Sequence, residues 1–122
     1  MHINSFVIPL EMTENNLQRS LRSILAVRPD DDLRDIDLTF LHMVSTRNAK
    51  HADVFLDLWR KRYDPPGRAT QSAPDPTAHY YRAYALYLKS SSDQAKQYLE
   101  QTIQKDQSGI VEKLVKTFGT PY

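Results

Sequence analysis

The chain has 122 residues, which is enough for one domain with a buried core. Its 16 Lys and Arg residues balance its 15 Asp and Glu residues, which argues against a basic field that would attract nucleic acid. The absence of cysteine excludes disulfides, thiolate metal sites and cysteine nucleophiles, and the presence of only 3 glycines excludes Gly-rich phosphate loops.

Residues 1–12 are expected to form an extended arm, because Pro9 interrupts their apolar run and prevents a helix from continuing. We favour an arm that packs on the domain or is disordered over a strand that binds a partner, since chain ends are mobile unless tied down. The arm lacks the basic region of a signal peptide, and no segment approaches the ~18 apolar residues of a membrane span. A soluble, cytoplasmic protein is therefore expected.

Three helices are predicted in the first half of the chain, over residues 14–28, 33–46 and 49–63. Thr13 should cap the first helix, and the run Asp30–Asp32 should cap the second. The alternative for this run, a calcium loop, lacks its alternating ligands and distal Glu. Apolar residues at helical spacing should form the buried faces: Leu17, Leu21, Ile24, Leu25, Leu33, Ile36, Phe40, Leu41, Val44, Ala52, Val54, Phe55, Leu56, Leu58, Trp59 and Tyr63.

A Pro-rich loop over residues 64–77 leads to three further helices, predicted over residues 78–90, 93–106 and 110–118. Thr77 should cap the first of these, Ser91 with Gln94 should form a capping box for the second, and Gly119 should end the third. The helix over 78–90 is apolar or aromatic nearly all round, which favours a central position. The chain is thus predicted to be all-α, with residues 13–122 forming one domain of about six short helices stacked as antiparallel hairpins.

The segment 79–107 resembles one tetratricopeptide repeat. Its small residues Ala83 and Ala95, its large residues Leu86 and Leu99, and its closing run 102–107 fit that family's pattern. It departs from the pattern where Trp, Ala and Pro are typical, at His79, Thr102 and Gln107. Residues 36–65 form a weaker second copy. The resemblance implies stacked hairpins whose ends are covered by the helices over 14–28 and 110–118, and an unrelated helical bundle is the alternative.

Tyrosine is the unusual component of the composition, at 7 residues. Tyr80, Tyr84 and Tyr87 follow one another at helical spacing, with Leu88 beside them, and the resemblance places the first helix of a repeat on a concave groove. Rigid tyrosines suit partner binding, although packing in the core explains them equally well. The family's clamp for chain ends uses Lys, Arg and Asn at these positions, so the resemblance does not extend to that function.

The densest basic cluster comprises Arg60, Lys61, Arg62 and Arg68. Basic residues beside aromatic ones can bind nucleic acid. However, consecutive residues point in different directions around a helix, and Asp53 and Asp57 precede the cluster on the same helix and should partly neutralise it.

The residues point to a non-enzymatic protein–protein interaction module, a small adaptor or chaperone that binds a peptide or helix of another protein. Its arm and tyrosine stripe should allow a homodimer to form. A helical protein that binds nucleic acid through the basic cluster is the alternative. The four histidines lack ligand spacing and no catalytic signature is present, so no metal, cofactor or catalytic residue is predicted.

Overall fold

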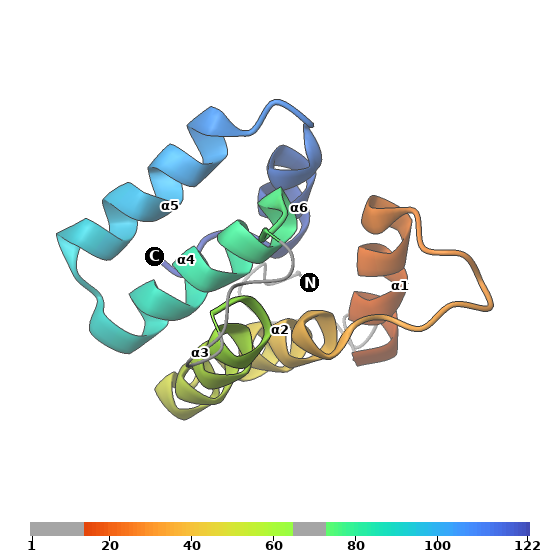
Figure 1. Cartoon of the computed structure of the whole chain (residues 1–122), viewed down its shortest axis with the longest axis horizontal. Helices are drawn as coiled ribbons and strands as arrows, with labels where there is room; N and C mark the ends of the chain where they lie inside the picture. Colours follow the sequence, from red (N-terminus) through yellow and green to blue (C-terminus); the bar gives the residue numbers. More distant parts are fainter. Residues whose placement is uncertain (1–13, 65–72) are drawn as a thin grey trace, which may run out of the picture.

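A computed structural model describes residues 14–64 and 73–122, and these residues form six α-helices and no strand (Figure 1). The helices are α1 (Glu14–Leu25), α2 (Asp35–Thr46), α3 (Ala49–Tyr63), α4 (Pro76–Ser90), α5 (Asp93–Lys105) and α6 (Ile110–Phe118). The predicted all-α fold is confirmed. The predicted arm over residues 1–12, most of the predicted loop and Arg68 lie outside the described residues.

Helix α4 lies at the centre of the molecule, as predicted from its apolar and aromatic sequence. It packs against α2, α3, α5 and α6, and Figure 1 shows it crossing the view between the α2–α3 pair and α5. Helix α6 also packs against α1, so the last helix closes onto the first. Because each repeat of a solenoid contacts only its neighbours, this closure goes beyond simple stacking. The tetratricopeptide-like arrangement stays a prediction.

The ends of the first two helices differ from those predicted. Helix α1 ends at Leu25, three residues before its predicted end, because Ala26 adopts a left-handed conformation with a φ of 54°. Helix α2 begins at Asp35 rather than at residue 33, and the run Asp30–Asp32 does not cap it. Instead, the side chain of Asp37 accepts a hydrogen bond of 2.9 Å from the backbone N–H of Arg34, the residue before the helix.

The caps of α4 and α5 are also shifted along the chain. Asp75, not Thr77, caps α4 by accepting a hydrogen bond of 2.8 Å from a backbone N–H in the first turn, which lets Pro76 occupy the first helical position. Ser92, not Ser91, caps α5, because Ser91 adopts the left-handed conformation that ends α4. The predicted bounds of α3 and α6 are confirmed.

Aromatic rings from α2, α4 and α6 meet in the core. The Phe40 ring stacks on the Tyr81 ring with 4.1 Å between their centroids. It also meets the rings of Tyr80, Tyr84 and Phe118 edge to face, at centroid distances of 5.5, 5.4 and 5.7 Å. Edge-to-face pairs are the arrangement that ring quadrupoles favour, so Phe40 holds three helices together through both area and geometry.

Most of the predicted buried faces are confirmed. Six of the predicted residues are half-buried against the core: Ile24, Leu25, Val44, Leu56, Leu58 and Trp59. Val54 is exposed, with 59% of its surface accessible. It precedes the buried Phe55 by one position, and one helical step turns a side chain by roughly 100°, away from the core. The predicted core residues that are buried are Leu17, Leu21, Leu33, Ile36, Phe40, Leu41, Ala52, Phe55 and Tyr63.

One buried carboxylate ties the start of α2 to α4. The Oδ2 atom of Asp37 accepts from Arg34 Nε at 3.1 Å, and its Oδ1 atom accepts from the Tyr81 hydroxyl at 2.8 Å. Arg34 Nη1 also reaches Asp75 at 3.0 Å, which connects the helix cap to the same network. Burial, together with the charge of Asp37, raises the pKa of Tyr81, so its hydroxyl stays a neutral donor.

Candidate functional site

The prediction that Tyr80 and Tyr84 line an exposed groove is wrong, because both side chains are fully buried. They lie on the side of α4 that packs around Phe40, and the Tyr80 hydroxyl donates a hydrogen bond of 2.6 Å to the carbonyl of Gly119. Burial raises the pKa of both tyrosines. The two tyrosines therefore contribute to the core, which is the alternative that the sequence left open.

The other two residues of the predicted groove, Tyr87 and Leu88, are half-buried. The Tyr87 ring lies 5.0 Å from the ring of Tyr122, and the Nζ atom of Lys96 lies 5.0 Å from that second ring. Tyr122 thus covers part of this surface. Tyr87 and Leu88 remain partly accessible, but Tyr80 and Tyr84, which were expected beside them on a groove, are buried.

The predicted basic cluster does not form one patch. Lys61 Nζ pairs with Asp57 at 3.2 Å, as the spacing predicted, and Arg62 Nη1 pairs with Asp35 of α2 at 3.4 Å. Arg60 is exposed and has no ion pair among the described residues, and Arg68 lies outside them. Much of the cluster's charge is therefore neutralised by neighbouring carboxylates.

A different cluster lies on the opposite side of α4, where α3, α4 and α5 run side by side. The guanidinium carbon of Arg82 lies 4.7 Å from the centroid of the Trp59 ring and 5.7 Å from that of the Tyr98 ring. All three side chains are half-buried. We call this arrangement the Trp59–Arg82–Tyr98 stack, and each such cation–ring contact stabilises the group by roughly 0.5–1 kcal/mol at exposed sites.

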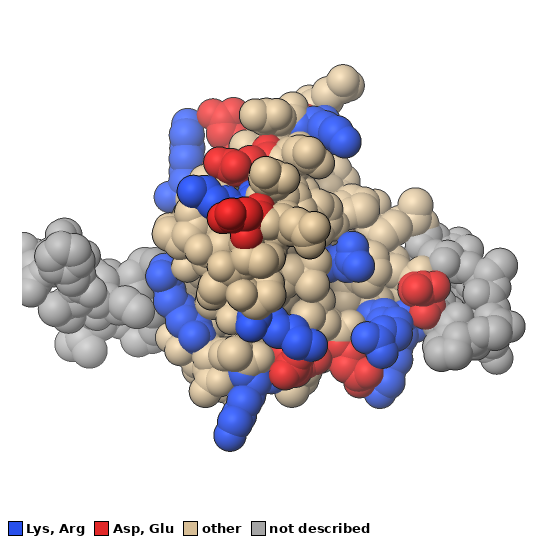
Figure 2. Space-filling view, turned by 90° about the vertical axis from the view of Figure 1, so that its left-hand side faces the viewer, with Lys and Arg blue, Asp and Glu red and all other residues tan. Residues whose placement is uncertain are grey.

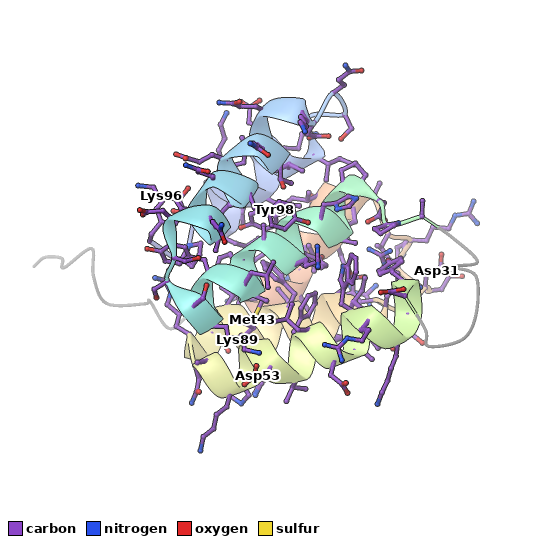
Figure 3. The ribbon with its side chains drawn as sticks, turned by 60° about the vertical axis from the view of Figure 1, so that its left-hand side comes forward. Asp31, Met43, Asp53, Lys89, Lys96 and Tyr98 are labelled. Carbon is purple, nitrogen blue, oxygen red and sulfur yellow. The ribbon has the colours of Figure 1, made fainter. Side chains whose placement is uncertain are left out.

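Hydrogen bonds hold the stack in place. Trp59 Nε1 donates to the carbonyl of Ala78 at 3.3 Å, which anchors the indole to the first turn of α4. The hydroxyl of Tyr98 lies 3.4 Å from Nδ1 of His79 and 3.5 Å from Nη1 of Arg82. Figure 3 shows Tyr98 reaching from α5 to α4. The stack is thus built from three helices and is held by hydrogen bonds within the chain.

Two hollows flank the stack on the face formed by α3, α4 and α5, which we call the α3–α5 face. Figure 2 looks at this side of the molecule and shows positive and negative side chains interspersed with uncharged ones. The first hollow, of about 280 Å³, is lined by Pro76, His79, Tyr98, Gln101, Thr102, Lys105 and Asp106. The second, of about 380 Å³, is lined by Asp53, Leu56, Asp57, Trp59, Arg60, Asp64, Arg82, Leu86 and Lys89.

Charge is distributed unevenly over this face. In the second hollow Asp53 pairs with Lys89 at 2.9 Å, and Figure 3 shows the two residues together where α3 and α4 meet. Arg82 has no carboxylate within ion-pair distance among the described residues. Burial lowers the pKa of His79, and the charge of Arg82 lowers it further, so the imidazole beside the stack is neutral near pH 7.

The spacing of residues along α4 contained a signal for this face, although the residue types alone did not indicate it. His79, Arg82, Leu86 and Lys89 follow the spacing i, i+3, i+7, i+10, which places them on one side of α4. This stripe carries the cations of a helix whose remaining sides are apolar or aromatic. Trp59 was expected in the core, and no sequence pattern predicted that Tyr98 would approach it across Arg82.

No protein-family model, curated protein or solved structure matches the chain. In residues 14–64 and 73–122, no three metal-ligating side chains gather at one point. Within the same ranges, none of the helices has the length and apolar character that crossing a bilayer requires. The expected cytoplasmic location stays a prediction.

Proposed function

We propose that this chain is a non-enzymatic protein–protein interaction module, a small tetratricopeptide-like adaptor or chaperone whose α3–α5 face binds a segment of another protein. The observation that carries the proposal is the half-exposed Trp59–Arg82–Tyr98 stack between two hollows. The proposed kind of function is the one that the sequence indicated. The proposed surface differs, because it lies on the side of α4 opposite to the buried tyrosines.

The composition and rigidity of the stack support this proposal. Trp, Tyr and Arg are the residues that most often dominate the binding energy of protein interfaces. A side chain that is already ordered loses less entropy on binding, and here each member of the stack has a ring contact or hydrogen bond that orders it. The hollows on both sides offer room for side chains of the partner.

Nucleic acid fits this face less well. Asp53, Asp57 and Asp64 line the second hollow, so a phosphate backbone crossing it would meet three carboxylates. The basic residues Lys61 and Arg62 of α3 are themselves paired with aspartates. We therefore favour a protein partner and make nucleic acid an outcome of the test.

The test is capture from a native extract by the immobilised chain, with bound proteins and nucleic acids identified by mass spectrometry and sequencing. Wild type is compared with Tyr98→Ser, which removes one side of the stack, and with the matched control Tyr122→Ser. We expect the same proteins on wild type and on the control, and their loss from Tyr98→Ser. Equal retention by all three proteins, or loss of retention after nuclease treatment, would contradict the proposal.

A further inference from the structure

Arg82 is a half-buried cation with an incomplete set of partners. Its Nη1 atom reaches the Tyr98 hydroxyl at 3.5 Å, and its guanidinium plane lies against two aromatic rings. Arg34 and Arg62 each pair with a carboxylate, but Arg82 has none among the described residues. A guanidinium offers five N–H donors in a rigid planar fork that matches a carboxylate, so most of its capacity is free for a ligand.

Arg82 itself lines the second hollow, and Tyr98 connects it to the first hollow. The lining of the first hollow includes the rings of Pro76, His79 and Tyr98, and its volume of about 280 Å³ gives room for a large side chain. The Tyr98 hydroxyl contacts Arg82 and its ring lines the hollow. An anionic group and an apolar group carried by nearby residues of one peptide would therefore meet their complements together.

We infer that the partner segment is an acidic peptide, in which an Asp or Glu carboxylate pairs with Arg82 while a neighbouring Leu or Phe side chain enters the hollow at His79 and Tyr98. This inference rests on the proposed function, since it names the chemistry that the α3–α5 face recognises. The charge complementarity is local: one carboxylate of the partner compensates one uncompensated guanidinium.

The surrounding charges favour a single side-chain carboxylate over a polyanion. Asp53 and Asp57 of the second hollow pair with Lys89 and Lys61, so their charges are largely compensated. A ligand with one carboxylate at Arg82 leaves these pairs intact. A continuous chain of phosphates would also have to extend past Asp64, which forms no ion pair among the described residues and would repel it.

The experiment uses an array of peptides with acetylated and amidated ends, each with one Glu beside Leu or Phe in a Gly and Ser background. Matched peptides carry Gln for Glu or Ser for the apolar residue, and further arms carry phosphoserine or are single-stranded oligonucleotides. Trp59 is the only tryptophan of the chain, so its fluorescence measures Kd directly at the stack. The full chain is used throughout.

We expect Glu peptides with Leu or Phe to bind, and either replacement in the peptide to weaken binding about tenfold or more. Arg82→Met should weaken the Glu peptides by a similar factor while leaving the Gln peptides unchanged. Arg82→Lys, which keeps the charge and loses the fork, should give an intermediate Kd. The matched control Arg19→Met alters an exposed arginine of α1, which packs against α2 and α6, and should bind like wild type.

Equal binding of Glu and Gln peptides, unchanged binding by Arg82→Met, or binding of no peptide would overturn the inference. Tighter binding of the phosphoserine or oligonucleotide arms would also overturn it in favour of phosphate. If Tyr98→Ser loses the captured proteins while Arg82→Met retains them, the proposed function stands. In that case only the inferred pairing of a partner carboxylate with Arg82 is wrong. Retention of the captured proteins by Tyr98→Ser would instead contradict the proposed function itself.

Discussion

The two sides of α4 use similar residues for different purposes. On the inner side Tyr80, Tyr81 and Tyr84 are fully buried around Phe40. On the outer side Arg82 lies half-buried between two rings that belong to α3 and α5. An aromatic stripe therefore does not by itself identify a binding surface. Where the rings have core neighbours they stabilise the fold, and where they flank an unpaired cation they can receive a ligand.

Among the substitutions on the two sides of α4, we expect replacement of Phe40 to have the largest effect on stability. Phe40→Ala removes the ring that four others contact, and we expect it to lower the free energy of unfolding by about 3–5 kcal/mol. Val54→Ala, at an exposed position of α3, is the control and should stay within about 0.5 kcal/mol of wild type. Urea denaturation followed by far-UV circular dichroism measures both, and equal values would contradict the assigned core.

Two hydroxyls on the inner side should behave differently from each other. Tyr81→Phe removes a donor to the buried Asp37, and we expect a loss of about 1.5–3 kcal/mol because the acceptor is charged. The Tyr84 hydroxyl is buried and has no hydrogen-bond partner among the described residues. Tyr84→Phe should therefore be neutral or stabilising in the same denaturation measurement. A large loss for Tyr84→Phe would reveal a partner for that hydroxyl.

On the outer side, Arg82→Met should change stability only slightly. The side chain loses its cation–ring contacts but keeps much of its apolar contact with Trp59, so we expect a loss of about 1 kcal/mol or less. Thermal unfolding of Arg82→Met beside wild type measures the difference. A loss as large as that of Phe40→Ala would mean that the stack supports the fold rather than a binding surface.

The smallest effect concerns the titration of His79. Burial and the positive charge of Arg82 lower its pKa, and Asp75 raises it. Tyr98, Lys105 and Asp106 share the hollow with the imidazole. Removing the cation in Arg82→Met should raise the pKa of His79 toward its ordinary value, as followed by NMR through the ring proton shifts. An unchanged or lower pKa would show that Arg82 does not act on His79.

The sequence predicted the helices well because each depends on local spacing, and several have Gly or Pro at an end. Two of the predicted caps that failed, Thr77 and Ser91, stood one or two positions from an equally suitable polar residue. The third, Asp30–Asp32, failed because α2 begins after Arg34, whose backbone N–H is satisfied by Asp37. Residue type cannot choose between neighbouring caps. The choice depends on which backbone conformation the tertiary packing allows, as the left-handed Ser91 shows.

The binding surface was harder to predict for a related reason. Tyr80 and Tyr84 satisfied the expected pattern, but the pattern does not say which side of α4 faces α2 and α6. The Trp59–Arg82–Tyr98 stack joins residues separated by 23 and 16 positions, on three helices, and depends on how those helices cross. Only the cationic stripe along α4 was visible in the sequence.

The most direct test of this account is an NMR titration of the ¹⁵N-labelled chain with a protein captured by the wild type. The single tryptophan gives one indole N–H signal, and that signal reports the stack. We predict shifts at the Trp59 indole and at the backbone of His79, Arg82 and Tyr98, while Tyr122 stays unchanged. Shifts centred on Tyr87 and Tyr122, or on Arg60–Arg62 with the indole unmoved, would contradict the assignment of the partner to the α3–α5 face.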